Sequence, residues 1–337
     1  GPVRARGTDP DTVAQIANRL LAAEYPVLIT RYAGRNPAFP ALVDELARYA
    51  GIRVFEAGAT CLNIAHDSPC YLGMTAGAAV PKADVGLMVD VDVPWIPSAT
   101  REDPASFWIH VDVDAIKEKT PMWGFPSNLR IQGDSCLILA QVLEALRLQA
   151  TPRFVQAARS RMAAIGRESA ARMAGIAKLA AHKGEPGQID VNYLCAEVGR
   201  ALSPNDIVFN EGIRSAPAIF NQVMRTVPGS IFGMPGSALG YSGGAALGAK
   251  LARPDALAAQ IVGDGSFYQC TPATVYAVSR QYGLPILTVV VDNAGWAAVK
   301  ESTLRMYPEG EATAAAQFEA RLASGMDFSK IAESAGA

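Results

Sequence analysis

The sequence has little of what nucleic-acid-binding, membrane and disulfide-rich proteins need. Its formal net charge is −2 and it contains no basic block, so it offers no electrostatic footprint for nucleic acid. No apolar run reaches the roughly 18 residues that a membrane-spanning helix requires, and the first residues lead us to expect no signal peptide. The five cysteines are scattered and never form a C-x-x-C pair, which favours reduced thiols over disulfides or a zinc site. We therefore expect a cytoplasmic protein with no nucleic-acid or membrane partner.

The hydrophobic residues that are present follow two alternating patterns. Half of the 337 residues are hydrophobic, which suffices for two domain cores. In the first half, helical spacing alternates with strand-like runs, the helices at 12–24, 40–51 and 135–149 and the strands at 25–30, 52–57, 83–93 and 107–114. The second half repeats the alternation, with helices at 191–203 and 271–283 and strands at 206–212, 257–265 and 285–293. Strands that alternate with crossover helices predict a parallel, doubly wound sheet.

The predicted fold class is therefore α/β, with two doubly wound parallel-sheet domains joined by a helical linker. Residues 1–150 are expected to form the first domain, and residues 151–187 a linker helix that ends near Gly187. Residues 188–337 are expected to form the second domain, which ends after one more short helix within 326–337. A parallel sheet that closes there would lack its last strand and helix, so we expect this domain to be incomplete at its C-terminus.

Two short motifs carry the chemistry. The segment GDGSF, residues 263–267, follows an apolar strand, and DNAGW, residues 292–296, follows the next one. Ligands of open α/β sheets lie beyond the carboxyl ends of the strands, so Asp264 and Asn293 are expected side by side. Carboxylate, amide and carbonyl oxygens form a hard ligand set that suits Mg²⁺. The glycines at 263 and 265 let the main chain approach a phosphate, to which Gly265 and Ser266 present amides.

These motifs resemble the thiamine diphosphate motif, which begins Gly-Asp-Gly and ends in Asn-Asn. The preceding segment PGSIFGMPGSALGYSGGAALGAKLA is similar to that of acetolactate synthases and benzoylformate decarboxylases, and YLGM at 71–74 and WIHVDVDAIKEK at 108–119 are similar to their central domain. The resemblance covers nearly the whole chain. It departs from the motif at Asp292, where the first asparagine is usual.

The resemblance implies a role for each matching residue. Asp264 and Asn293 would bind Mg²⁺ by their side chains and Gly295 by its carbonyl. The diphosphate would be held by the GDG turn and by the loop 210–215. The residues implied for cofactor binding are Gly212, Ile213, Arg214, Ser237, Leu239, Gly263, Gly265, Ser266 and Trp296.

Within this set, individual residues differ in their implied task. Leu239 would be the wedge under the cofactor that bends it into a V shape, and the Ser237 carbonyl would accept from its aminopyrimidine. Ile213 and Arg214 replace the small hydroxyl residues common in decarboxylases, and a guanidinium could serve the diphosphate instead. Trp296 is equally compatible with lining the substrate mouth and with packing.

The resemblance also implies a catalytic glutamate on an N-terminal domain of the neighbouring chain. That domain does not match any part of these 337 residues. We therefore expect a piece of a longer enzyme that forms a homo-oligomer, a dimer or tetramer, through its cofactor-binding domain, and that is inactive by itself. The expected substrate is a small 2-oxoacid or acyl compound.

The reaction implied is thiamine diphosphate- and Mg²⁺-dependent cleavage or formation of a C–C bond next to a carbonyl. Acetolactate synthases bind FAD through a turn with arginine and glycine, whereas this chain has VDVDVPWIP at residues 89–97, so FAD is not expected. We favour an acetolactate synthase-like 2-oxoacid decarboxylase or carboligase, with a 2-hydroxyacyl-CoA lyase as the alternative enzyme. A non-catalytic module that binds a cofactor or a partner remains the alternative of another class.

The sequence leaves one further feature of the first domain open. Asp112 and Asp114 end one of its strands, in a region that binds a nucleotide in some relatives. We interpret them as a solvated strand end.

Overall fold

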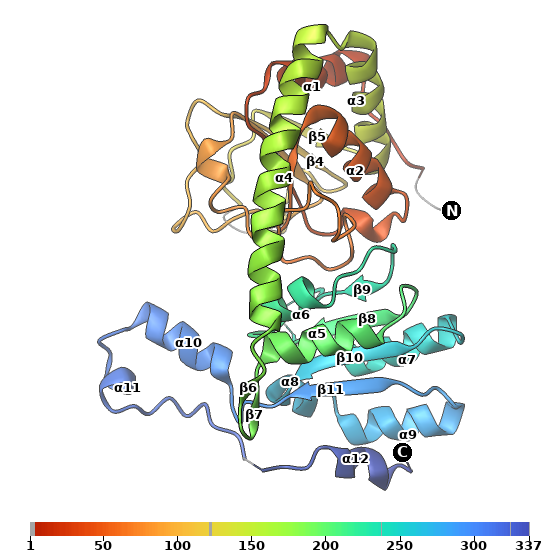
Figure 1. Ribbon diagram of the computed structural model, residues 1–337, viewed down its shortest axis with the longest axis vertical. Helices are drawn as coiled ribbons and strands as arrows, with labels where there is room; N and C mark the ends of the chain where they lie inside the picture. Colours follow the sequence, from red (N-terminus) through yellow and green to blue (C-terminus); the bar gives the residue numbers. More distant parts are fainter. Residues whose placement is uncertain (1–3, 121–122, 237, 324, 337) are drawn as a thin grey trace. The chain divides into compact units, whose positions relative to one another are not determined.

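The computed structural model describes residues 4–120, 123–236, 238–323 and 325–336. Its residue contacts divide the chain into two compact units. Figure 1 shows the chain coloured by residue number. The first unit runs to Lys178 and includes the segment 225–229, and the second comprises 179–224 and the residues from Ser230 onward. The domain boundaries predicted from the sequence stay a prediction beside this division.

The first unit is built on a five-stranded parallel sheet in the order β2-β1-β3-β4-β5. The strands are β1 (Pro26–Thr30), β2 (Arg53–Glu56), β3 (Val85–Val89), β4 (Phe107–Asp112) and β5 (Leu129–Gln132). One face of the sheet is covered by α1 (Pro10–Ala22), α2 (Phe39–Ala50) and α3 (Ser135–Gln149), whose apolar residues share one core with Leu28, Leu87 and Ile109 of the strands. The short 3-10 helices η1 (Ala33–Arg35) and η2 (Val80–Lys82) lie in the connections.

Local signals fix the ends of these helices. The Asp9 carboxylate accepts hydrogen bonds from the Thr12 amide at 2.9 Å and the Thr12 hydroxyl at 2.6 Å, which caps α1. At the C-terminal end of α2, Gly51 takes the left-handed conformation with φ of 64°, which a residue without a Cβ adopts at little cost. Asp9 directly precedes α1 and Gly51 directly follows α2, so both end signals are visible in the sequence.

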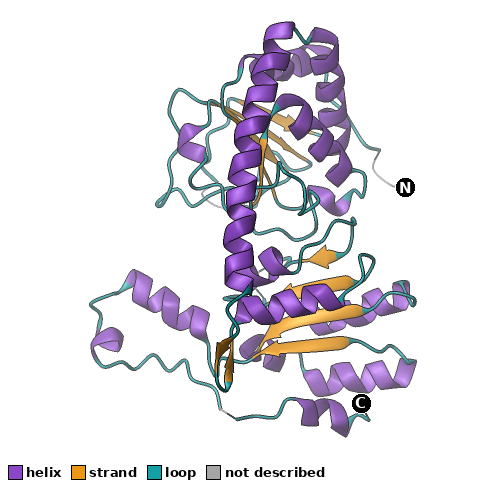
Figure 2. Cartoon of the chain, in the orientation of Figure 1, coloured by secondary structure: helices purple, strands orange, loops and turns teal. Residues whose placement is uncertain are grey.

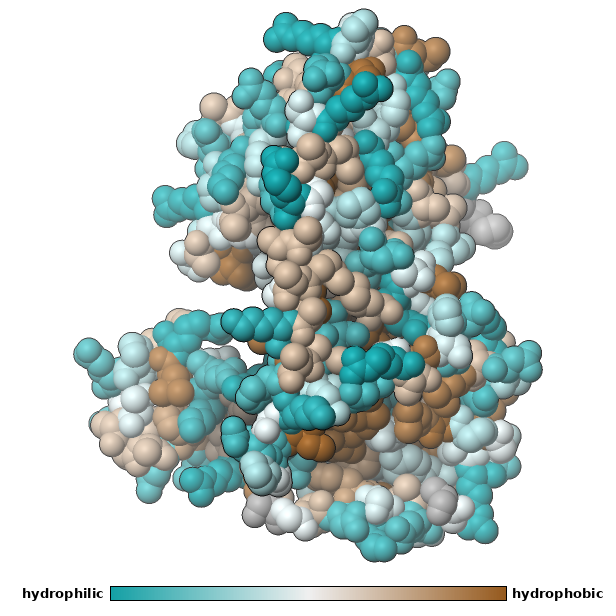
Figure 3. All heavy atoms as spheres, viewed as in Figure 1, coloured by the Kyte–Doolittle hydropathy of each residue, from teal (hydrophilic) through white to brown (hydrophobic). Residues whose placement is uncertain are grey.

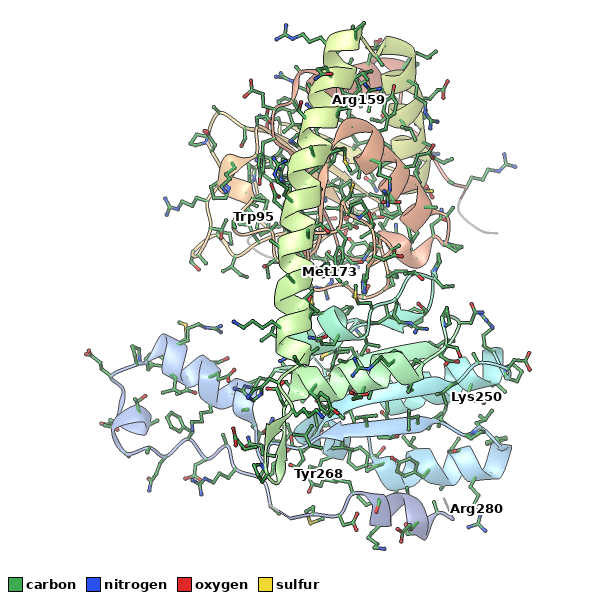
Figure 4. The ribbon with its side chains drawn as sticks, viewed as in Figure 1. Trp95, Arg159, Met173, Lys250, Tyr268 and Arg280 are labelled. Carbon is green, nitrogen blue, oxygen red and sulfur yellow. The ribbon has the colours of Figure 1, made fainter. Side chains whose placement is uncertain are left out.

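The opposite face of this sheet is covered by loops instead of crossover helices. Four aromatic side chains fill the space there, and Figure 4 labels Trp95 among them. The ring centroid of Trp95 lies 4.7 Å from that of Trp108 and 5.2 Å from that of Phe125, which in turn lies 5.4 Å from Trp123. Trp108 stands opposite Gly86 in the strand register, and a Cβ at position 86 would lie only 2.1 Å from the Trp108 ring.

The long helix α4 (Pro152–Ala180) packs on the first unit. The buried Arg161 side chain donates to the carbonyls of Ala50 and Ala23, at 2.7 Å each, and so closes the ends of the two helices beneath it. Arg53 adds a bidentate pair with Glu168, at 2.9 and 2.7 Å.

No helix within the described residues is long and apolar enough to cross a membrane.

The second unit contains a four-stranded parallel sheet in the order β11-β10-β8-β9. Its strands are β8 (Ile207–Glu211), β9 (Ile231–Phe232), β10 (Ala258–Gly263) and β11 (Leu287–Val291). The helices of this unit, shown in purple in Figure 2, are α5 (Val191–Ala201), α6 (Ala216–Gln222), α7 (Ser242–Ala252), α8 (Asp264–Gln269), α9 (Pro272–Tyr282), α10 (Ala297–Met306), α11 (Glu311–Ala314) and α12 (Ser329–Ser334). The edge strand β11 is only partly covered, and hydrophobic residues reach the surface in this region in Figure 3.

The α/β class with parallel, helix-flanked sheets is confirmed. Several details differ from the sequence-based expectation, and one is the strand expected over 257–265, which ends at Gly263, directly before α8 begins. Strands β5 and β9 were not foreseen, and the linker helix ends at Ala180 instead of near Gly187. The residues after it form a small antiparallel ribbon of β6 (Gly184–Glu185) and β7 (Gln188–Ile189).

Candidate functional site

Four turns of the second unit surround one cavity of about 430 Å³. Three of the turns follow β8, β10 and β11, and the fourth precedes α7. The cavity therefore lies at the carboxyl edge of the parallel strands, where ligands of open α/β sheets bind. The residues that line it are Gly212, Ile213, Arg214, Ser215, Met234, Gly236, Leu239, Gly263, Asp264, Gly265, Ser266, Asn293, Gly295, Trp296, Ala297, Ala298 and Val299.

Asp264 is the buried carboxylate of this cavity, with 2% of its surface exposed. Its Oδ2 atom accepts a hydrogen bond of 2.9 Å from the Gly295 amide, which ties the turn after β10 to the turn after β11. Burial raises the pKa of the Asp264 carboxyl above its usual value, the Gly265 and Gly295 amides lower it, and the neighbouring Asp292 carboxylate raises it again. The carboxylates of Asp264 and Asp292 therefore lie close enough to influence each other's charge.

The turn after β11 is shaped by close contacts of its backbone. Ala294 takes φ of 54°, and its amide donates to Asp292 Oδ1 at 2.8 Å. A Cβ at Gly295 would lie 2.4 Å from the Ala320 carbonyl oxygen, so the main chain leaves no room for a side chain there. The Trp296 amide donates to the same carbonyl at 2.7 Å. These contacts keep Asn293 and Gly295 at the mouth of the cavity beside Asp264.

This arrangement fits a magnesium ion. Among the described residues no group of three or more His, Cys, Asp or Glu is arranged to hold a metal, so a transition-metal site of that kind is not supported here. Asp264, Asn293 and the Gly295 carbonyl instead offer oxygen donors at one side of the cavity, where Asp292 adds a second carboxylate near Asp264. Mg²⁺ takes one or two carboxylates and completes its octahedron with phosphate and water oxygens. The sequence-predicted donors are therefore of the right type for that ion.

The segment before α7 is held by a residue whose role was not foreseen. Glu211, at the end of β8, is fully buried, and its carboxylate accepts from the amides of Gly240, Tyr241 and Ser242, the last at 2.9 Å. The carboxylate also accepts from the Cys270 thiol at 3.5 Å. Charge-assisted bonds to three successive amides fix the loop that carries Leu239 into the cavity. The acidic residue directly after an apolar strand was the only signal in the sequence.

Leu239 and Trp296 form the apolar side of the cavity and are both half-buried. The six-membered ring of Trp296 lies where a Cβ at position 265 would be, 2.5 Å from that point, so Gly265 provides the space for the indole. Trp296 is thus both a packing residue and a wall of the cavity. Ser237 lies outside the described residues.

The loop after β8 brings an arginine to the cavity. Asn210 Oδ1 accepts from the Gly212 amide at 3.0 Å and turns the chain at the strand end. Ile213 and Arg214 follow and line the cavity, and Arg214 forms an ion pair with Glu301 of α10. Every predicted metal- or cofactor-binding residue that the structure describes therefore lies on this one cavity. That they bind these ligands stays a prediction.

The carboxyl edge of the first sheet corrects one interpretation. Asp112 is fully buried instead of solvated, while Asp114 is exposed as expected. Lys117 Nζ donates to Asp112 Oδ2 and to Asp92 Oδ1, at 2.8 Å each, and the Tyr32 hydroxyl donates to Asp112 at 2.7 Å. Burial raises the pKa of Asp112, but the His110 ring 3.5 Å away and hydrogen bonds from Lys117, the Asp114 amide and Tyr32 outweigh it and lower the pKa to about 2. The sequence did not reveal the lysine because it follows the strand by five positions in an irregular loop.

A family model and known proteins are similar in sequence to part of this chain. The family model described as "Thiamine pyrophosphate enzyme, C-terminal TPP binding domain" matches residues 218–337. The chain is 40% identical over 103 residues to 3D-(3,5/4)-trihydroxycyclohexane-1,2-dione hydrolase of Lacticaseibacillus casei, a match that covers 30% of this chain and 15% of that protein. It is 33% identical over 101 residues to benzoylformate decarboxylase of Pseudomonas aeruginosa, covering 30% of this chain and 19% of that protein.

Solved structures are similar over the whole chain. A thiamine diphosphate-dependent 4-hydroxybenzoylformate decarboxylase of Rhodococcus jostii matches with a TM-score of 0.73 at 20% identity. A benzoylformate decarboxylase of Polynucleobacter necessarius matches with a TM-score of 0.74 at 17% identity. Each match covers 100% of this chain and 60% of the solved one, so this chain spans less than two thirds of their length. Residues 218–337 therefore match the model of the C-terminal TPP-binding domain of thiamine pyrophosphate enzymes, and the chain as a whole shares the fold of these solved structures.

Proposed function

We propose that the cavity of the second unit binds the diphosphate end of thiamine diphosphate through Mg²⁺, in an acetolactate synthase-like 2-oxoacid decarboxylase or carboligase. One observation carries the proposal: the residues matched to the cofactor motif, which lie up to 84 positions apart from Gly212 to Trp296, line a single cavity at one sheet edge. A structural role alone would not require a buried carboxylate beside a second one, with carbonyl and amide oxygens around them.

Each residue of the chain has a task in this proposal. Asp264, Asn293 and the Gly295 carbonyl hold the cation, and the amides of Gly265 and Ser266 hold phosphate oxygens. Glu211 fixes the loop that places Leu239 on the apolar side of the cavity, and Trp296 excludes water from that side. The cofactor, when bound, supplies the carbanion chemistry by which a bond next to a carbonyl is cleaved or formed.

A second chain is part of the proposal. None of the described residues that line the cavity is a glutamate, whereas the resemblance implies one from a neighbouring chain. We propose that this protein acts as a homo-oligomer in which the neighbour supplies that carboxylate, with a small 2-oxoacid or acyl compound as substrate. A 2-hydroxyacyl-CoA lyase would use the same cavity.

Calorimetric titration with thiamine diphosphate in the presence of Mg²⁺ tests the site without requiring turnover. We expect Asp264→Ala and Asn293→Ala to lose at least about tenfold in affinity, because each removes an oxygen from the ion. Asp255→Ala is the matched control, since Asp255 is exposed, belongs to the same unit and does not line the cavity. Tight binding by both cavity variants would exclude the assigned ligands, whatever the activity of the protein.

A further inference from the structure

Helix α10 is attached to the second unit by few contacts. None of its residues is buried, although its first turn, with Ala297, Ala298 and Val299, lines the cavity. Lys300 Nζ lies 5.3 Å from the Phe318 ring centroid, and Glu301 pairs with Arg214. Glu301 thus joins α10 to the loop after β8 across the mouth of the cavity. An element with few buried contacts opens at low free-energy cost.

The ion pair at this mouth is poorly suited to a purely structural role. The side chains of Arg214 and Glu301 are 57% and 52% exposed, and exposed pairs stabilise proteins little. Arg214 also lines the cavity in which the anionic end of the cofactor is proposed to lie. A diphosphate carries more negative charge than one carboxylate and presents oxygens that a guanidinium can bind in a bidentate manner. Glu301 and a bound diphosphate would therefore compete for the same guanidinium.

We propose that Glu301 is a resident anion for Arg214 that a diphosphate ligand displaces, and that this exchange releases α10 from the loop after β8. The inference rests on the proposed function, because it needs a diphosphate in the cavity. It adds a specific consequence: Glu301 weakens ligand binding, and ligand binding changes the freedom of a helix at the cavity mouth. The exchange of Glu301 for a diphosphate at Arg214 involves only ion pairs and hydrogen bonds, and no covalent bond changes.

Titration with Mg²⁺ and inorganic diphosphate, and separately with thiamine diphosphate, tests the exchange. We expect Glu301→Gln to bind either ligand about two- to fivefold more tightly, because the competing carboxylate is lost while the size of the side chain is kept. Glu197→Gln is the matched control: Glu197 forms an exposed pair with Arg200 on α5, away from the cavity, and carries the same charge. This control should bind like the wild type.

A double-mutant cycle separates exchange from the general effect of removing a negative charge. Arg214→Met should weaken diphosphate binding by about tenfold, since a charge-assisted contact is lost. In the Arg214→Met background, Glu301→Gln should bring no further gain. A gain that persists without Arg214 would mean that Glu301 acts through space, and would overturn the exchange.

Hydrogen exchange of the α10 amides provides a readout that is independent of affinity. In the absence of ligand, Glu301→Gln should exchange faster than the wild type in α10, and the wild type should approach that rate when diphosphate is added. Diphosphate binding that is equal in the wild type and Glu301→Gln, with α10 exchange unchanged, would overturn the inference and leave the proposed function standing. Absence of diphosphate binding in every variant would overturn both.

Discussion

Lys117 places an ammonium group between Asp92 and Asp112 at the carboxyl edge of the first sheet. Without it, a fully buried carboxylate would face a second one with no cation between them, and uncompensated buried charges are costly. We expect Lys117→Met to lower the free energy of unfolding by about 3–5 kcal/mol, measured by urea denaturation at neutral pH. Lys330→Met removes an exposed lysine that pairs with Glu333 and should change it by less than about 1 kcal/mol. An equal effect of the two substitutions would contradict the assigned role.

The same residues predict how stability depends on pH. The pKa of Asp112 is about 2 in the folded protein and 3.8 in its usual state, so the unfolded chain binds its proton first as the pH falls. The stabilisation is therefore complete above pH 3.8 and is lost as the pH falls toward 2, by about 2 kcal/mol in total. Unfolding measured across this range should show that loss in the wild type and not in Asp112→Asn. Parallel curves for the two proteins would contradict it.

At the residue scale, the sequence predicted the residues that line the cavity better than the residues that hold the surrounding loops in place. Asp264 and Asn293 stand at strand ends within a recognisable motif, so their position on one cavity followed from the alternation of strands and helices. Glu211 and Lys117 act on backbone and side chains that are distant in sequence. No local pattern identifies such partners, because the contact exists only once the chain is folded.

Among the elements, β3 and β4 show how aromatic side chains cover the face of the first sheet that has no crossover helices. The Trp108 ring occupies the space above Gly86, and loops carrying Trp95 and Phe125 complete the layer. We expect Gly86→Ala to lower the free energy of unfolding by about 1–3 kcal/mol, because its methyl group would collide with the indole. Gly166→Ala is the matched control. Its Cβ would meet nothing within 4 Å, so this change within α4 should stabilise the protein by about 0.5–1 kcal/mol. Both values can be measured by urea denaturation, and an equal sign would contradict the packing argument.

The elements that the sequence predicted are those with strong periodicity and clear end signals, such as α1 with Asp9 and α2 with Gly51. Strand β9 has two residues, and β5 has four with an exposed pattern at its edge of the sheet. Segments this short carry too few positions for alternation to be read. The aromatic layer was also missed, because Trp95, Trp123 and Phe125 lie in loops, whose sequences have no period.

For the whole molecule, the division into two units predicts separate responses to a ligand. A ligand that binds only the second unit stabilises that unit by mass action, by about 2.7 kcal/mol at a concentration one hundred times its dissociation constant. We expect thiamine diphosphate with Mg²⁺ to slow hydrogen exchange in β10 and to leave β3 unchanged. Equal slowing in both strands would mean that the two units open as one.

One feature of the chain path limits how the protein can be cut. The segment 225–229 belongs to the first unit, where the Arg225 carbonyl accepts from the His66 amide at 2.9 Å, although both neighbouring stretches of chain belong to the second. If a protease cuts the ribbon between α4 and α5, segment 225–229 of the C-terminal product should stay packed in the first unit. The two products should therefore still elute as one species under native conditions. Recombinant expression from residue 179 onward would in turn expose Arg225, of whose surface only 3% is exposed in the full chain, because the rest of the first unit would be missing.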